Sequence, residues 1–175
     1  MTNLLKIFIC KFKYTRGDIM NLNDFGVLKY ENHGSKNTDD YETKYMQDID
    51  EKDHITGEIS ISPIKDGEFG KKFYIWIIDH DGEEKWGIKI QNPFIIEEDG
   101  VTKIYTKDGR LYKFLDSLFK EILGTKYKKH NSYTIDFEIF RESIKTTIKN
   151  ITVHAVPSEH PKAKYPDFEV IAMGV

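Results

Sequence analysis

Residues 71–91, KKFYIWIIDHDGEEKWGIKIQ, leave few alternatives to a β-hairpin. Nearly every residue from Phe73 to Ile78 is β-branched or aromatic, which favours an extended strand over a helix. Asp81-Gly82 is the strongest two-residue turn signal in the chain. Residues 86–91 then alternate apolar and polar side chains. The pattern predicts two antiparallel strands joined by a tight polar turn.

Both faces of the first predicted strand are apolar. Side chains alternate across a strand, so one face holds Phe73, Ile75 and Ile77, and the other holds Tyr74, Trp76 and Ile78. Two interpretations follow. Either one face covers a core while the other offers aromatic rings to a partner, or the strand is buried on both sides.

Length and composition predict one globular domain. A chain of 175 residues with 39% hydrophobic and 13% aromatic residues can build a substantial core. Its net charge of -3 argues against binding of duplex nucleic acid through a uniformly basic surface. The charge is uneven, however: residues 20–70 hold 5 Lys and 12 acidic residues, whereas residues 101–175 hold 13 basic and 9 acidic residues. The second half can therefore still carry one positive groove.

The first nineteen residues differ in character from the rest. Residues 16–20 can be encoded with a purine-rich ribosome-binding sequence ahead of the Met20 codon. We therefore expect residues 1–19 to be a non-native upstream extension or a disordered N-terminus. An additional strand over Ile7-Phe8-Ile9 is the competing interpretation. The segment is too interrupted by Lys for a membrane span, and it lacks the cleavage site of a secretory signal.

After a polar N-terminal arm or loop predicted for residues 20–55, we expect one folded domain over residues 56–175. Apolar periodicity and turn residues predict strands at 56–64, 73–78, 86–91 with a continuation at 94–96, 101–106, 150–156 and 168–172.

Two helices are predicted in the second half. Residues 109–123 carry the strongest helical pattern, with one apolar face formed by Leu111, Phe114, Leu115, Leu118, Phe119 and Ile122. Asp108 is the expected N-cap and Gly124 the expected C-terminal stop. A second, shorter helix is expected after Asp136, which is placed to cap it.

The sequence contains no recognisable catalytic or cofactor motif. Cys10 is the only cysteine, which excludes an intramolecular disulfide and fits a cytoplasmic protein. No phosphate-binding glycine loop occurs, and the histidines do not pair at a metal-binding spacing. We interpret Asp79-His80-Asp81 as part of the hairpin turn. The expectation is a non-enzymatic protein with no cofactor and no metal, and with no membrane partner because no apolar run reaches the ~18–20 residues of a span.

Three strands, a helix and two further strands make up the order of the OB-fold, a five-stranded Greek-key barrel. In this order the chain resembles the single-stranded-DNA-binding proteins of bacteriophages. The resemblance rests on residues 56–64, the 71–91 hairpin, the helix at 110–123, and the segments 150–156 and 165–172. It implies a mainly β fold with two helices, built as an OB-fold-like barrel with a helix between strands three and four.

The resemblance also implies a function in DNA replication or recombination in the bacterial cytoplasm. Unpaired bases would stack on exposed rings while Lys side chains follow the phosphates. The stacking candidates are Tyr74 and Trp76, with Trp86 as a third whose face, shared with Ile88 and Ile90, suggests burial. The candidate phosphate contacts are Lys71, Lys72, Lys89, Lys126, Lys128 and Lys129.

The expected partner is single-stranded DNA, with RNA left open, and replication or host proteins are further candidates. The alternative function is a small phage-encoded inhibitor of a host enzyme or defence complex. Its acidic first half would then mimic nucleic acid. The sequence leaves the oligomeric state open.

Overall fold

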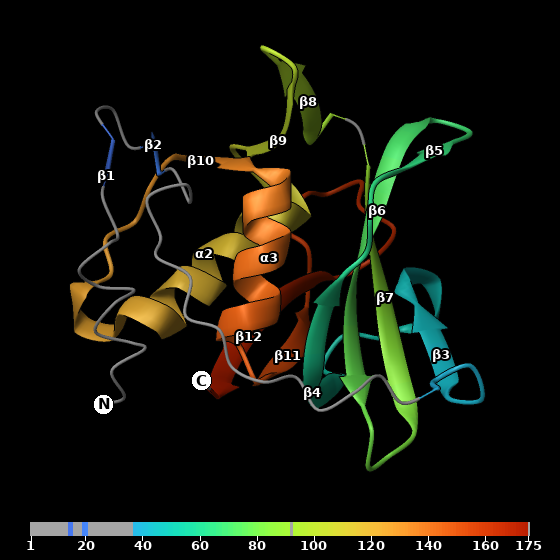
Figure 1. Cartoon of the computed structure of the whole chain (residues 1–175). Helices are drawn as coiled ribbons and strands as arrows, with labels where there is room; N and C mark the ends of the chain where they lie inside the picture. The colour runs from blue at the N-terminus through green and yellow to red at the C-terminus, as the bar shows by residue number, and fades with distance from the viewer. Residues whose placement is uncertain (1–13, 16–18, 21–36, 92, 175) are drawn as a thin grey trace.

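The structure, a computed structural model, describes residues 14–15, 19–20, 37–91 and 93–174. They form two β-sheets and two α-helices (Figure 1). The larger sheet has the order β12 (Asp167–Gly174), β11 (Asn150–Val156), β4 (His54–Ile61), β6 (Gly70–Asp79), β7 (Glu84–Gln91) and β3 (Glu42–Tyr45), with β5 (Lys65–Gly67) paired to β6. The smaller has the order β1 (Tyr14–Thr15), β2 (Ile19–Met20), β10 (Ser132–Asp136), β9 (Val101–Thr106) and β8 (Ile95–Glu98).

The predicted hairpin of residues 71–91 is confirmed as β6 and β7. The two strands pair antiparallel, and Trp76 lies opposite Gly87. The predicted polar turn is a four-residue connection, residues 80–83, which contains Asp81-Gly82. The Asp79 carboxylate accepts a hydrogen bond from the Gly82 amide at 2.9 Å, so the side chain closes the turn.

Both predicted helices are confirmed as α2 (Gly109–Leu123) and α3 (Phe137–Thr147). Gly124 ends α2 with a φ of 55°, a conformation that glycine adopts without steric cost. Asp136 caps α3, because its side chain accepts a hydrogen bond from the Ile139 amide at 3.1 Å. Asp108 occupies the N-cap position of α2, but its side chain makes no capping hydrogen bond.

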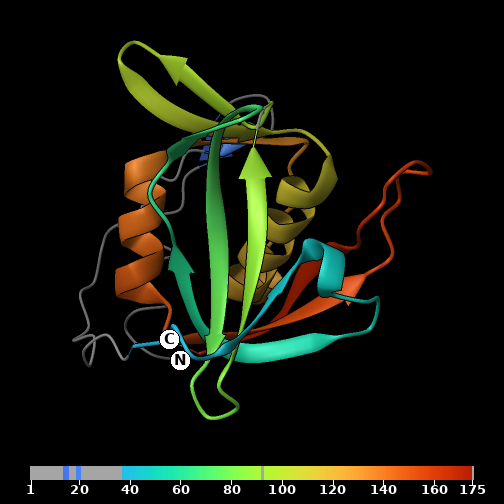
Figure 2. The same ribbon diagram turned by 90° about the vertical axis from the view of Figure 1, so that its right-hand side faces the viewer.

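The core lies between the larger sheet and the two helices. Figure 2 shows α2 behind the β6–β7 hairpin and α3 beside β4. Ile75 and Ile77 are fully buried, and the ring of Phe73 packs 4.9 Å from that of Phe137 on α3. One face of the first predicted strand therefore covers the core, as both interpretations require, while Tyr74, Trp76 and Ile78 on the other face are only partly buried.

Strand β4 changes partners at Gly57. Residues 54–57 pair with β11, whereas residues 58–61 pair with β6. A Cβ at Gly57 would lie 2.1 Å from the carbonyl oxygen of Ile78, so only glycine allows the two backbones to approach this closely. The bend at Gly57 lets one strand belong to both halves of the curved sheet.

The mainly β class with two helices is confirmed, and the described strands are more numerous than predicted. Hairpin β8–β9 and strand β10 form a second sheet with the short N-terminal strands. The larger sheet is open, because its order runs from one edge strand, β12, to the other, β3, without closing. Strand β3 pairs parallel with the outer edge of β7. At the other edge, β12 lies against α2, where the Val170 amide donates to the Ser117 hydroxyl at 2.8 Å.

The arm predicted over residues 20–55 differs from what its described part shows. Residues 42–45 form β3, the 3-10 helix η2 (Met46–Asp48) follows, and Ile49 is buried in the core. Residues 21–36 lie outside the described residues. So do residues 1–13 and 16–18, which hold most of the proposed upstream extension, including the alternative strand at 7–9. In the described part of the chain, no helix combines the length and apolar character needed to cross a membrane.

Candidate functional site

The side chains on the outer face of β6 and β3 form an aromatic cluster. Tyr74 and Trp76 point away from the core, and their rings stack at a centroid distance of 5.4 Å and an interplanar angle of 24°. Tyr45, from β3, meets both rings edge-on at centroid distances of 6.1 Å and 6.0 Å. We call these three residues the aromatic face. All three keep part of their surface in solvent.

Gly87 makes room for the aromatic face. It lies opposite Trp76 on β6 and beside Tyr45 on β3. A Cβ at this position would lie 2.7 Å from Cζ3 of Trp76 and 3.1 Å from Cδ1 of Tyr45. The indole therefore lies directly over the backbone of β7, and any larger residue there would displace it.

Three lysines surround the rings. Lys72 Nζ lies 5.8 Å from the centre of the Tyr74 ring, and Lys85 Nζ lies 5.4 Å from that of Trp76. Lys89 lies opposite Tyr74 in the β6–β7 register. None of these three face lysines makes an ion pair with another described residue. Their charges remain available to an anion that approaches the rings.

One acidic side chain next to the face is already engaged. Glu58, on β4, lies opposite Ile78, and its Oε2 is 3.1 Å from Nε2 of His80. The other ring nitrogen of His80 is 3.1 Å from the hydroxyl of Tyr41. Glu58 and Tyr41 thus hold the imidazole of His80 from two sides at the edge of the face.

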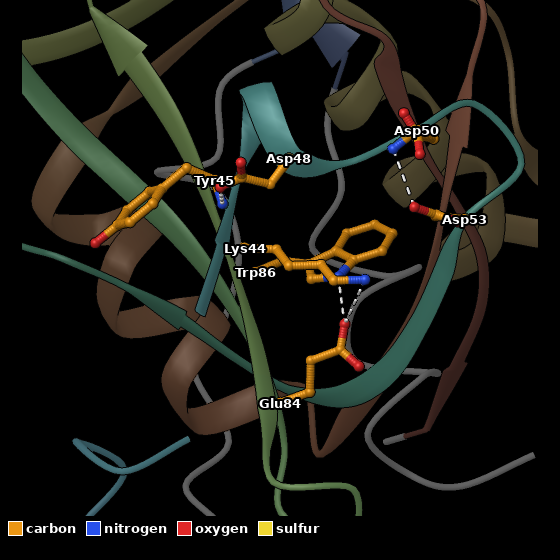
Figure 3. Close-up of polar contacts among 7 residues, drawn as sticks. All are labelled: Lys44, Tyr45, Asp48, Asp50, Asp53, Glu84 and Trp86. Carbon is orange, nitrogen blue, oxygen red and sulfur yellow. Dashed lines mark hydrogen bonds and ion pairs between the residues drawn. The ribbon is translucent and has the colours of Figure 1, made fainter. Parts of the chain in front are cut away.

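Trp86, one of the predicted stacking residues, is buried, so its predicted role is wrong. It is 1% exposed, and its ring packs against Phe168 at 6.1 Å. Its indole N–H donates to Glu84 Oε1 at 3.1 Å, and Lys44 Nζ lies 3.6 Å from the same oxygen (Figure 3). Figure 3 also shows Tyr45 directed to the side opposite Trp86. The face shared with Ile88 and Ile90 indicated this burial.

Lys71 is also away from the aromatic face. It has the same parity along β6 as the core-facing Phe73, and its Nζ lies 3.6 Å from Asp66 and 3.8 Å from Glu97. The contact with Glu97 joins β6 to the hairpin β8–β9, whereas Asp66 lies on β5. Lys71 therefore has two acidic neighbours within the protein, and its phosphate contact stays a prediction.

Lys126, Lys128 and Lys129 lie on the far side of the molecule. They belong to the connector between α2 and β10, whose first residues form the 3-10 helix η3 (Gly124–Lys126). In Figure 1 this connector lies at the end of α2, on the side of the molecule away from β6 and β7. The three lysines are exposed, but they cannot share one groove with Trp76.

The site residues that the sequence interpretation missed are Tyr45, Lys85 and Gly87. Lys85 and Gly87 share the parity of Lys89 on β7, which is a signal available from the alternation alone. No sequence signal identifies Tyr45, because the polar segment around this residue does not show that it forms a strand or with which strand that strand pairs.

The side chains of the aromatic face are of kinds that suit binding. Within residues 37–91 and 93–174, no group of three or more His, Cys, Asp or Glu side chains is arranged to hold a metal ion. Rings, ammonium groups and hydroxyls are what the face presents, and they suit planar, anionic partners. No protein-family model matches the chain, and no curated protein or solved structure matches it either.

Proposed function

We propose that the chain is a single-stranded nucleic-acid-binding protein that acts in phage-type DNA replication or recombination in the bacterial cytoplasm. The observation that carries the proposal is the aromatic face with its three lysines. Stacked Tyr74 and Trp76 offer flat surfaces for unpaired bases, and each stacked base contributes ~1–3 kcal/mol. Lys72, Lys85 and Lys89 supply the charge that a phosphate backbone needs.

The proposal includes an OB-like core. Its support is the strand order β11-β4-β6-β7. Strands β4, β6 and β7 form a three-stranded meander, and the first half of β4 also pairs with β11 of the later hairpin β11–β12. The ring contact between Trp86 and Phe168 draws β7 and β12 together across the core. In this proposal β3 occupies the edge of β7 at which a closed barrel would place its fifth strand. Tyr74 and Trp76 then lie on the second barrel strand and Lys85 and Lys89 on the third, where OB-folds bind oligonucleotides.

The test is fluorescence anisotropy with a labelled oligo-dT at low ionic strength. We expect saturable binding that weakens with salt, because phosphate contacts release counterions. Tyr74→Ala and Lys85→Ala should each weaken binding. Removal of one phosphate contact should also lower the magnitude of the salt slope by about 0.7.

The matched control for the lysine variant is Lys128→Ala, which removes an equal charge on the far side of the molecule. On a short oligonucleotide, this variant should bind like the wild type. Absence of salt-dependent binding by the wild type at low ionic strength would end the proposal.

The alternative is a protein inhibitor with an acidic surface that mimics nucleic acid. The exposed carboxylates of Asp48, Asp50 and Glu51 lie close in sequence to Tyr45 and favour this function. A host protein captured from nuclease-treated lysate, together with no oligo-dT binding, would support the inhibitor instead.

A further inference from the structure

We propose that the connector lysines Lys126, Lys128 and Lys129 dock on an acidic edge of a second copy of this chain. The acidic edge consists of Asp48, Asp50 and Glu51. Copies would then join head to tail, through two different surfaces of each molecule.

The connector presents its lysines on a fixed backbone. Tyr127, between the lysines, donates its hydroxyl hydrogen to the Asp116 carboxylate on α2. Tyr112 donates to the carbonyl oxygen of His130, which is buried at the end of the connector. The three lysines between and beside these anchors are exposed, and none forms an ion pair with a described residue. The connector is therefore a cationic surface whose backbone is fixed by two side-chain hydrogen bonds.

The acidic edge lies beside a cleft. A cavity of about 660 Å³ separates η2 and the following turn from the proline-rich link between β11 and β12. Asp50 and Glu51 line one wall, and His160 and Lys164 line the other. Neither Asp50 nor Glu51 forms an ion pair with another described residue. Figure 3 shows Asp53 directed to the Asp50 amide, at 3.0 Å, while the Asp50 carboxylate points away from it.

The two surfaces are complementary and lie on opposite sides of the fold. Residues 124–130 contain three lysines and no acid, whereas residues 46–53 contain four acids and one lysine. In Figure 1, η2 and β3 are at one side of the molecule and the connector is at the other. A single molecule cannot bring them together. Contact between unlike surfaces of identical chains continues from copy to copy, as an open array unless the rotation closes a ring.

Docking would also change the aromatic face, a consequence that rests on the proposed function. Tyr45 immediately precedes η2, and its amide donates to the Asp48 carboxylate at 3.4 Å, so one carboxylate of the acidic edge lies beside the aromatic face. Neighbouring carboxylates repel phosphates, and lysines from a second copy would neutralise them. A nucleic-acid strand bound on one copy would then favour binding of the next copy along the same strand.

The association is expected to be weak and sensitive to salt. Exposed ion pairs are individually weak, so the copies should associate only at high protein concentration. The Debye length falls from ~30 Å at 0.01 M salt to ~3 Å at 1 M, so high salt should separate the copies.

Sedimentation velocity without nucleic acid tests the docking. The wild type should show a mean sedimentation coefficient that rises with protein concentration at low salt and not at high salt. In the variant Lys128→Glu/Lys129→Glu, the connector becomes acidic like the acidic edge. In the variant Asp50→Lys/Glu51→Lys, the acidic edge becomes basic like the connector. Each alone should stay monomeric, and an equimolar mixture should associate again.

The matched control is Lys107→Glu/Lys149→Glu, which changes the net charge equally at two exposed lysines outside the connector. It should associate like the wild type. A wild type that stays monomeric at low salt, reversed variants that still self-associate, or a mixture that stays monomeric would each overturn the proposal. Circular dichroism of every variant shows that it is folded.

The two proposals fail separately. If docking fails, short-oligonucleotide binding by single copies is unaffected. If nucleic-acid binding fails, the sedimentation result still stands. If Lys128→Glu/Lys129→Glu weakens binding of a short oligo-dT to dilute protein, the connector contacts nucleic acid itself and the docking proposal is wrong.

Discussion

The indole of Trp76 lies over Gly87, its partner across β6 and β7, with no side chain between the ring and the backbone. This relationship positions the aromatic face, because the same glycine also lies beside Tyr45. A Cβ at position 87 would come within 2.7 Å of the indole. The absence of a side chain on β7 thus determines where a ring on β6 lies.

Gly87→Ala should therefore weaken oligo-dT binding. Displacing the indole removes one stacking surface, and a loss of about 1.4 kcal/mol corresponds to about tenfold in the dissociation constant. Overpacking should also lower the free energy of unfolding by roughly 1–3 kcal/mol. Ser60→Ala, opposite Trp76 on β4, is the control and should leave the indole in place. Unchanged affinity in Gly87→Ala would show that the position of the ring does not matter for binding.

Gly57→Ala should destabilise the fold more than any other substitution of a glycine by alanine in the sheet. Its Cβ would lie 2.1 Å from the Ile78 carbonyl oxygen, and a backbone atom cannot move aside as a side chain can. Gly100→Ala is the control that adds backbone strain without a clash, because Gly100 has a φ of 76° and no atom lies within 4 Å of its Cβ position. That control should cost about 1–2 kcal/mol. Urea unfolding of both variants makes the comparison, and equal losses would contradict the close approach at Gly57.

The two helix N-caps make a matched pair. Asp136 accepts a hydrogen bond from the Ile139 amide, whereas the Asp108 side chain makes no such bond. Asp136→Ala should lower the free energy of unfolding by about 1 kcal/mol. Asp108→Ala should cost less, and Asp136→Ser should retain most of the stability. Thermal unfolding of the three variants would contradict the assignment if Asp108→Ala were the more damaging change.

The tyrosines around Asp116 predict a loss of stability at alkaline pH. Burial, and secondarily the Asp116 carboxylate, raises the pKa of Tyr112 to about 12. The pKa values of Tyr127 and Tyr133 are raised for the same first reason, and Tyr133 donates to Asp116 at 2.7 Å. A raised pKa gives stability that is present below the ordinary value of 10.0 and is lost as the pH rises towards the folded value.

Titration of tyrosinate absorbance, followed together with circular dichroism, measures this effect. Tyr112, Tyr127 and Tyr133 should ionise only as the chain unfolds. If all tyrosines titrate together near pH 10 while the protein stays folded, the buried phenol network is not as described.

The elements with strong local signals were predictable from the sequence. Asp81-Gly82 and the run from Phe73 to Ile78 determine a hairpin locally, and the apolar face of residues 109–123 determines a helix. The capping role of Asp136 was also predictable, because a cap depends on residues within one turn. The alternation of Trp86 with Ile88 and Ile90 pointed correctly to burial.

Long-range placement was not predictable. Strand β3 is short, polar and paired in parallel with a strand some forty residues later in the chain, so its hydrophobic pattern does not reveal its position. The connector lysines were assigned to the groove because their charge suits phosphate. Their actual side follows from α2 packing on β12 across the core, and spacing alone does not encode that packing.

Fluorescence of Trp86→Phe tests the central claim most directly, because Trp76 is then the only tryptophan in the chain. Circular dichroism first shows that the variant is folded. If the aromatic face binds unpaired bases, added oligo-dT should quench the Trp76 emission saturably, and the midpoint should move to higher oligonucleotide concentration with salt. Trp76 emission that stays unchanged at low ionic strength, with excess oligo-dT present, would contradict the account.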